Sequence, residues 1–377
     1  MKIFQIVSGL DAKSGGPSYT VTRLSENLHR LGLDVSIDTL NCGVEGPKGV
    51  NITQHKRQVL AKRLGISPVM KKSLLSRVSE GDVIHSSGLW MMPNIYPLAI
   101  ARKSRAKYVI SPRGMLAEWS LNQRKLLKRA VGALGQNTVI YNADCIHVTA
   151  ESEYEDVRRY GYKGPIALIP NGVDMPNKIS APNAPRGKRK AIFISRVHPK
   201  KGIERLLRVW QKVEGDYPSW KLEVCGPGEA NYVTEIKQKI SSTRGNVKYI
   251  EPVYGKDKEE FYRSSNLFIL PTYSENFGVV VAEALSYEIP AIVTKGAPWG
   301  GMRENKCGWW IDISDEALES ALREALSLNA ERLNEMGRNG RQWMMSEFSW
   351  QKIAQDTKQT YRWLHGQAQK PECVYLD

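Results

Sequence analysis

The chain has 377 residues, of which 41% are hydrophobic and 25% charged. This length is too great for one comfortable core and suits two α/β domains. The formal net charge of +15 predicts an anionic partner such as a nucleotide, a nucleic acid or a phospholipid. Residues 1–175 carry 24 Lys and Arg against 14 Asp and Glu, and the remainder carries 30 against 25. We therefore expect the first half to provide any anion-binding surface.

Cysteine usage and hydropathy indicate the compartment. The five cysteines, Cys42, Cys145, Cys225, Cys307 and Cys373, stand singly without a C-x-x-C pair. This argues against a zinc site or a disulfide framework and fits a reducing environment. The opening apolar run is too short for a signal peptide, and no stretch approaches the roughly 18 apolar residues of a membrane span. We expect a cytoplasmic protein that is soluble or attached to the inner membrane surface.

Short β-branched apolar runs alternate with helical patterns from the first residue onward. Strands are predicted over residues 2–8, 34–40, 82–86, 107–111, 144–150 and 165–170. Helical patterns lie between them, for example over 17–31 and 151–161. Several of these runs are continuously apolar, which is typical of parallel strands buried on both faces.

The pattern stops at residues 175–190, which are rich in Pro, Asn and basic residues and indicate a linker. It then restarts, with strands predicted over 191–195, 220–224, 247–250, 266–270, 290–294 and 308–312. The fold class is therefore α/β, with two doubly wound domains at 1–174 and 191–349 and a cleft between them. A helix at about 350–368 is expected to pack back on the first domain. Ligands of such sheets bind beyond the carboxyl ends of the strands.

The first glycine-rich turn follows the first predicted strand. In "SGLDAKSGGPSYTVTRL" (8–24), Gly15 and Gly16 allow backbone N–H groups to approach an anion, and Pro17 suits a first helical turn. The spacing is not G-x-G-x-x-G, so a dinucleotide site is not indicated. A plain turn is the alternative.

The segment "ISRVHPKKGIERLL" (194–207) places two cations beside a helix start. Arg196 ends the first strand of the second domain, and Lys201 precedes Gly202 at the next helix. A guanidinium, an ammonium and free helix N–H groups together suit a diphosphate. The alternative is a solvated basic loop.

Two carboxylates flank a turn in "PTYSENFGVVVAEAL" (271–285). Glu275 lies in the loop and Glu283 lies two turns into the following helix. Carboxylates beside a diphosphate site would accept hydrogen bonds from hydroxyls, each worth about 1.5–3 kcal/mol. A sugar nucleotide has both phosphates and hydroxyls. The alternative is a core network at Glu283 and a plain loop charge at Glu275.

Taken together, R-x4-K and E-x7-E at these strand ends resemble the family 4 retaining glycosyltransferases, which adopt the GT-B fold. The resemblance covers nearly the whole chain, including the Gly-Gly-Pro turn, "PNGVD" (170–174) and the tail helix. "PRGML…W" (112–119) and "TKGAPW…CGWW" (294–310) resemble the bacterial surface-polysaccharide branch.

The resemblance implies a role for each matching residue. Arg196 and Lys201 would bind the donor diphosphate and stabilise the leaving group, Glu283 would bind the ribose, and Glu275 the donor sugar. The implied donor-binding set comprises Gly15, Gly16, Arg196, Lys201, Val253, Tyr254, Glu275, Asn276, Phe277, Gly278 and Glu283, with Val253 and Tyr254 beside the base.

The resemblance also sets expectations for substrates and metals. No D-x-D occurs, so we expect no metal and no cofactor, the nucleotide sugar being a substrate. The donor is expected to be UDP-linked, with GDP second, and the acceptor a polyprenyl-diphosphate-linked glycan in O-antigen, capsule or exopolysaccharide assembly. The oligomeric state stays open.

The sequence departs from many relatives at one position. They have His where this chain has Arg113, near the donor sugar. His85, at another strand end, is a second candidate catalytic residue that replaces part of that function. The alternative for His85 is a histidine satisfied by structural hydrogen bonds.

Residues 120–134 and 55–78 are basic and amphipathic. In 120–134 the cations Arg124, Lys125, Lys128 and Arg129 are expected on one helix face, opposite leucines and other apolar residues. Such helices bind anionic membrane surfaces, or have a core-facing stripe and a solvated back. The charge of this half favours an anionic inner-membrane surface.

Three other functions compete with sugar transfer. A glycoside hydrolase would use Glu275 and Glu283 as acid and base, but it needs no diphosphate site. A nucleotide-sugar 2-epimerase of the same fold would have different motifs. A nucleic-acid binder would explain the charge, yet no binding module is recognisable, so we expect no nucleic acid as partner.

Overall fold

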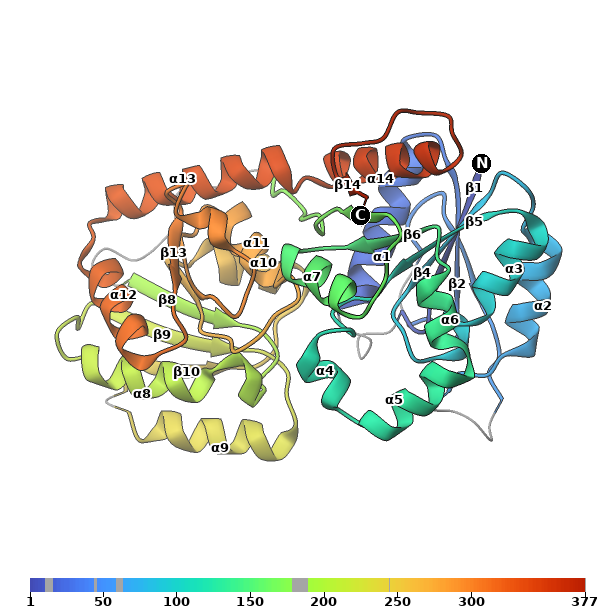
Figure 1. The fold of residues 1–377 in the computed structure, drawn as a ribbon. Coiled ribbons are helices and arrows are strands. Elements are labelled where there is room, and N and C mark those ends of the chain that lie inside the picture. Colours follow the sequence, from blue (N-terminus) through green and yellow to red (C-terminus); the bar gives the residue numbers. More distant parts are fainter. Residues whose placement is uncertain (11–15, 44–45, 59–63, 178–188, 244, 377) are drawn as a thin grey trace. The chain divides into compact units, whose positions relative to one another are not determined.

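The computed structural model describes residues 1–10, 16–43, 46–58, 64–177, 189–243 and 245–376 (Figure 1). The chain divides into two compact units. The first comprises Met1–Gly172 and Trp350–Asp377, and the second Val173–Ser349. Each is a parallel or largely parallel sheet with helices between its strands, which confirms the predicted α/β class. Most of the expected linker, residues 178–188, lies outside the described residues.

The first unit contains an eight-stranded sheet in the order β14-β7-β6-β5-β4-β1-β2-β3. Its strands are β1(Lys2–Val7), β2(Asp34–Thr39), β3(Asn51–Gln54), β4(Val83–Ser87), β5(Lys107–Ser111), β6(Cys145–Val148), β7(Ile166–Leu168) and β14(Val374–Tyr375). All pairs are parallel except the antiparallel pair of β14 and β7. Every strand predicted for the first half is present. The pattern missed β3, whose residues are exposed or only half-buried, and the two-residue β14.

Helices connect these strands. They are α1(Gly16–Arg30), α2(Pro68–Arg77), η2(Met92–Asn94), α3(Tyr96–Ser104), α4(Glu118–Asn122), α5(Lys125–Val131), η3(Gly132–Gln136), α6(Asn137–Tyr141), α7(Glu151–Arg159) and α14(Trp350–Leu364).

The first sheet is covered by apolar side chains on both faces, which explains its continuously apolar strands. In β1, Ile3 and Val7 belong to a core shared with residues of α1 and α14. Phe4 and Ile6, which point to the opposite face, belong to a second core with residues of α2 and α3.

The tail helix α14 belongs to the first unit, where it packs on α1. Its Trp350 ring lies edge-on to Tyr19, with ring centroids 6.0 Å apart. The Lys358 ammonium donates to the carbonyl of Leu31 at 2.8 Å. A side chain at Gly172 would collide with the Trp350 ring, so this glycine lets the chain pass the helix closely.

The second unit contains a six-stranded, fully parallel sheet in the order β10-β9-β8-β11-β12-β13. Its strands, each of them predicted, are β8(Arg189–Ile194), β9(Trp220–Cys225), β10(Val247–Ile250), β11(Leu267–Leu270), β12(Ala291–Thr294) and β13(Gly308–Ile311). Its helices are η4(Pro199–Lys201), α8(Ile203–Val213), α9(Ala230–Ser241), α10(Gly255–Arg263), α11(Val279–Ser286), η5(Gly300–Met302), α12(Asp315–Ser327) and α13(Ala330–Glu347). Central strands β8, β11 and β12 are buried almost throughout.

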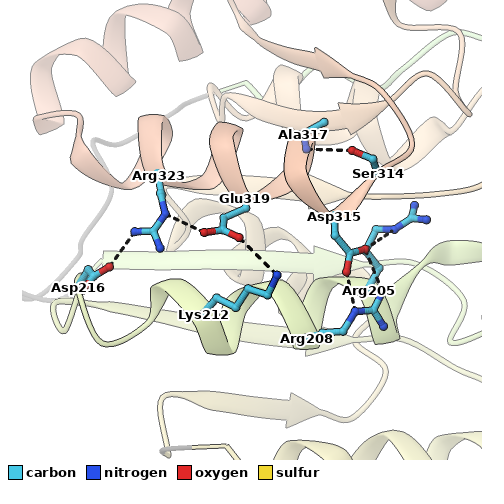
Figure 2. A network of polar contacts seen from close by, with 9 residues as sticks. All are labelled: Arg205, Arg208, Lys212, Asp216, Ser314, Asp315, Ala317, Glu319 and Arg323. Carbon is cyan, nitrogen blue, oxygen red and sulfur yellow. Dashed lines mark hydrogen bonds and ion pairs between the residues drawn. The ribbon is translucent and has the colours of Figure 1, made fainter.

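A polar network fastens α8 to α12 (Figure 2). The Asp315 carboxylate receives a two-pronged contact from Arg208, at 2.6 and 2.9 Å, and a further contact from Arg205 at 3.3 Å. In the middle of the network, Glu319 lies 3.5 Å from the Lys212 ammonium. The Ser314 hydroxyl caps α12 by accepting from the Ala317 amide at 3.0 Å. The network holds α8, which begins two residues after Lys201.

One predicted helix is wrong. Residues 120–134 do not form a continuous helix, because Arg124 adopts a left-handed backbone conformation (φ 52°) between α4 and α5. The chain then passes through the π-helical turn η3, in which Gly135 has φ 140°. In the described parts of the chain, no helix has the length and apolar character to cross a membrane.

Candidate functional site

The polar residues singled out in the second unit follow the carboxyl ends of adjacent parallel strands. Arg196 follows β8 and is exposed, and Glu275 follows β11. Gly226, after β9, has φ 148°, and a side chain there would collide with the carbonyl of Ser195. The backbones of these strand ends therefore approach each other closely, as in a doubly wound sheet whose ligands bind at this edge.

Lys201 and Glu275 form an ion pair between the loops that follow β8 and β11. The side chain of Lys201 is 7% exposed and that of Glu275 18%. Gly202, which starts α8 with φ 72°, lies so near the carbonyl of Pro271 that any side chain would collide with it. This glycine brings Lys201 against the loop that carries Glu275.

Backbone hydrogen bonds fix the Glu275 loop in place. The Tyr273 amide and the Thr272 hydroxyl donate to the carbonyl of Lys200, at 2.8 and 3.1 Å. The Glu275 amide donates to Gly296 at 2.6 Å, and the Trp299 indole to the carbonyl of Phe277 at 2.6 Å. The loop is therefore held from β8 on one side and β12 on the other.

The cations near Glu275 affect one another. Burial, together with the positive charges of Arg196 and Lys200, lowers the pKa of Lys201 to about 7. The pKa of Lys200 is lowered by burial and by Arg196, and that of His198 by burial and the same cations. Such a cluster of mutually repelling positive groups is suited to an anion that would relieve the repulsion.

The carboxylate of Glu283, on α11, is held by two side chains of α10. Lys258 contacts one oxygen at 2.7 Å, and the Tyr262 hydroxyl donates to the other at 2.8 Å. Tyr262 is buried, which raises its pKa well above the usual value, so it remains a neutral donor. A carboxylate has about four acceptor positions, so Glu283 retains capacity for a hydroxyl ligand. Sequence analysis missed Lys258 and Tyr262, because only the packing of α10 on α11 brings them to Glu283.

The remaining donor-site candidates are divided between the two units. Gly278 starts α11 in a left-handed conformation (φ 79°), which places the preceding Asn276 and Phe277 at the helix N-terminus. Val253 and Tyr254 follow β10, and the Tyr254 side chain is exposed at the start of α10. In the first unit, Gly16 is the exposed first residue of α1. Gly15 lies outside the described residues.

His85 lies in a buried chain of hydrogen bonds in the first unit. Its Nδ1 is 2.6 Å from the Tyr361 hydroxyl of α14, and its Nε2 is 2.7 Å from the Ser111 hydroxyl. Ser111 lies 2.8 Å from Nδ1 of His147, whose Nε2 lies 2.8 Å from the carbonyl of Ile169.

The hydrogen bond to the carbonyl of Ile169 determines which atom carries each proton in this series of hydrogen bonds. His147 must donate from Nε2 to the carbonyl of Ile169, so its Nδ1 accepts from Ser111, which in turn accepts from His85 Nε2. His85 Nδ1 then accepts from Tyr361. Burial, and secondarily the charge of Arg113, lower the pKa of His147 to about 3. Burial and then His147 lower the pKa of His85 well below its usual value. Both rings are neutral and fully bonded, which favours the structural alternative for His85.

Arg113 lies after β5 with a left-handed backbone (φ 56°). One guanidinium nitrogen, Nη1, donates to the amide oxygen of Asn171 at 2.9 Å, while its Nε is buried and has no partner. Burial lowers its pKa, against the opposing charge of Glu153. Glu153, missed by sequence analysis, accepts from the Gly114 amide at 2.5 Å and from the Thr149 amide at 2.8 Å. It thus ties the Arg113 loop to the loop after β6.

Metal-binding side chains do not gather in the described residues. No group of three or more His, Cys, Asp or Glu there could hold a metal ion. The positive charge beside Glu275 comes from lysine and arginine.

Two curated relatives illustrate the sequence similarity. The chain is 23% identical over 401 residues to a D-inositol 3-phosphate glycosyltransferase of Corynebacterium urealyticum, an alignment that covers 93% of this chain and 91% of that protein. It is 30% identical over 173 residues to the capsular polysaccharide biosynthesis glycosyltransferase CapM of Staphylococcus aureus, covering 45% of this chain and 44% of that protein.

Two solved structures share the fold. Sucrose-phosphate synthase from Thermosynechococcus elongatus superposes with a TM-score of 0.78 at 19% identity, covering 97% of this chain and 100% of that chain. Anabaena Alr3699/HepE, solved in complex with UDP-glucose, superposes with a TM-score of 0.73 at 15% identity, covering 96% and 99%.

Family models match both halves of the chain. Residues 14–176 match the model described as "Glycosyltransferase Family 4", and residues 174–343 match "Glycosyl transferases group 1". Because the two matches together span residues 14–343, this chain, with its GT-B fold, belongs to the family 4 glycosyltransferases.

Proposed function

We propose that the protein is a retaining transferase that moves a sugar from a UDP-linked donor to a lipid-linked glycan acceptor in surface-polysaccharide assembly. The observation that carries this proposal is the ion pair of Lys201 and Glu275 beside exposed Arg196 at the strand ends. One ligand with adjacent phosphates and hydroxyls satisfies all three groups. Family membership removes the support for the hydrolase and the nucleic-acid binder.

The pair would separate when the donor binds. Lys201 and Arg196 would contact the diphosphate, and Glu275, released from Lys201, would accept from sugar hydroxyls. Glu283 would accept from the ribose with its unused lone pairs while Lys258 and Tyr262 hold it in position. The N-terminus of α11 would present amides to the phosphates and sugar, a role that the resemblance also implies for Gly16.

The bonds and the proton of the proposed transfer are accounted for without a cofactor. The bond between the anomeric carbon and the diphosphate oxygen breaks, and the same face of that carbon bonds to the acceptor oxygen. The acceptor's proton passes to the departing phosphate, whose negative charge Arg196 and Lys201 offset. Arg113 is proposed to lie near the donor sugar, and we expect no metal requirement.

The acceptor proposal draws on two observations. The segments 112–119 and 294–310 resemble the bacterial polysaccharide branch, and the Staphylococcus relative is named for capsule biosynthesis. A polyprenyl-diphosphate-linked acceptor would require the enzyme to work at the cytoplasmic face of the membrane. UDP is proposed as the nucleotide because the Anabaena structure holds UDP-glucose.

The test is thermal stabilisation of the purified chain by UDP, GDP and ADP, in EDTA and then with Mg²⁺. A ligand at 100 times its Kd should add about 2.7 kcal/mol of stability. Stabilisation by one diphosphate in EDTA, lost in Arg196→Ala, would support the site. If none of the three stabilises the protein, the proposed donor site is wrong. Proton NMR of the first glycoside formed would distinguish retention from inversion.

A further inference from the structure

The segment from Glu118 to Leu134 in the first unit exposes apolar side chains that a helix normally buries. Trp119 of α4 is 53% exposed, and Leu126 and Leu127 of α5 are 80% and 48% exposed. Leu134, in the following turn η3, is 82% exposed. Single exposed leucines are ordinary, but four large apolar residues exposed within sixteen positions, here called the apolar patch, indicate a binding surface.

Little of this segment packs on the rest of its unit. Helix α4 buries none of its residues, and α5 buries only Val131. Helix α5 packs against α4 and η3, its neighbours in the chain. Figure 1 shows α4 and α5 at the lower edge of the unit, away from the strands of its sheet. Helices this short are not stable through backbone hydrogen bonds alone, so a partner that covers the patch would also stabilise them.

Cations lie among these apolar residues in the sequence. Arg124, Lys125 and Arg129 are exposed, and the left-handed turn at Arg124 separates α4 from α5. Lys128 is instead drawn towards the protein, where it donates to Ser120 and lies 5.7 Å from the centroid of the Trp90 ring. Residues 118–134 contain one acidic residue, Glu118, against these four cations.

Helix α2, in the same unit, provides a contrast. It is also basic, but Met70 and Leu74 are buried in the core, and the exposed Lys71 and Lys72 lie on its solvated side. Of the two predicted basic amphipathic segments, 55–78 therefore has the core-facing arrangement in its described part. Helix α2 also exposes Val69 and Leu75, but Met70 and Leu74 anchor it in the core, whereas α4 and α5 together bury only Val131.

We propose that residues 118–134 form a docking surface for an anionic phospholipid bilayer. Trp119, Leu126, Leu127 and Leu134 would enter the boundary between headgroups and acyl chains, and Arg124, Lys125 and Arg129 would contact lipid phosphates. Leucine, tryptophan and cations on one short segment are the composition of interfacial membrane-binding elements. Charge complementarity selects an anionic lipid over a neutral one. The surface shares no residue with the proposed donor site and does not depend on the proposed transfer.

The experiment is co-sedimentation of the full chain with vesicles of phosphatidylcholine alone and with 30% phosphatidylglycerol, in low and high salt. We expect binding to the anionic vesicles that weakens with salt, and little binding to neutral ones. Replacing Arg124, Lys125 and Arg129 by Gln should weaken partitioning about a hundredfold, since each cation contributes about fivefold. Leu126→Ser with Leu134→Ser should weaken it by more than about tenfold.

The matched control is Val69→Ser with Lys71→Gln and Lys72→Gln on α2, where Val69 is 58% exposed. It should bind vesicles as the unchanged protein does. Stabilisation by UDP, measured in every variant, reports on folding and on the donor site independently. Equal binding to neutral vesicles, unchanged binding of the leucine variant, or no binding to either vesicle would overturn the proposal. So would a dimer that the leucine substitutions dissociate in the absence of lipid, which would assign the patch to a second copy of the chain.

Discussion

Both units have polar side chains on or after their parallel strands. The first unit holds them with neutral hydrogen bonds, and the second with ion pairs. In the first, His85, Ser111 and His147 form a buried chain of neutral hydrogen bonds. In the second, Lys201 with Glu275 and Lys258 with Glu283 form partly exposed charged pairs.

The difference indicates which of the two groups of polar side chains can bind a ligand. A neutral chain in which every donor has an acceptor is stable when buried, but it has no position for a ligand. A charged pair has unused lone pairs and donors, and it can exchange one partner for a phosphate or a hydroxyl. The charged pairs of the second unit are therefore the groups that can bind a donor.

The largest expected effect is acid destabilisation of the first unit. His85 and His147 have lowered pKa values when folded, so below about pH 6.5 the unfolded chain binds protons that the folded chain does not. Stability should fall between pH 7.5 and pH 5 by about 2 kcal/mol for each histidine. Hydrogen exchange resolved by mass spectrometry would locate the loss to β4, β5 and β6. A variant with both histidines changed to Gln should lose most of this pH dependence; retention of the full dependence would show that other groups cause it.

Next in size is the loss of the buried cation. Lys201→Ala should weaken UDP binding by about a hundredfold, because a hydrogen bond to a charged group is worth about 1.5–3 kcal/mol and an unpaired Glu275 would repel phosphate. Uridine binding should be unchanged, because uridine has no phosphate. Calorimetric titration with UDP and uridine measures both. Unchanged affinity for UDP would remove Lys201 from the diphosphate site.

Glu275→Gln should reduce sugar transfer about ten- to a hundredfold, since the amide is a weaker acceptor for sugar hydroxyls. The affinity for UDP should change less than about threefold, because UDP has no donor sugar. Equal losses of transfer and of UDP binding would contradict the assignment of Glu275 to the sugar. Glu288→Gln serves as a control, since Glu288 contacts Arg341 at 3.8 Å and is not one of the proposed donor-binding residues.

The smallest expected effect is the pH dependence of donor binding. With the pKa of Lys201 at about 7, the ammonium is lost as the pH rises above that value. UDP affinity should therefore fall about tenfold between pH 6 and pH 8.5, while uridine affinity stays level. Lys201→Arg keeps its charge throughout this range and should flatten the curve. A steep curve in that variant would assign the titration to another group.

Local sequence patterns predicted most of the architecture. The apolar strand runs and the glycines before α8 and α11 are local signals, so the strands and the places of Arg196, Lys201, Glu275 and Glu283 were predictable. Edge strand β3 was not predicted because it lacks a buried apolar run. The continuous helix over 120–134 was wrong because the backbone is left-handed at Arg124, which ends α4 before α5 begins. The core-facing stripe was wrong as well, since Leu126, Leu127 and Leu134 are exposed.

By itself, the sequence determined the two α/β units, the family and the strand-end positions of the cations and carboxylates, because periodicity and short motifs act over a few residues. Only the tertiary structure decided which groups are partners. The Tyr361 hydroxyl bonds to His85, which lies 276 residues earlier in the sequence, and the Tyr262 hydroxyl of the preceding helix donates to Glu283. Those contacts depend on how helices pack against the sheets. The same packing decides that His85 is neutral and bonded, and it lowers the pKa of Lys201 beside Glu275 to about 7. Burial and neighbouring charges, which local sequence does not specify, set both pKa values.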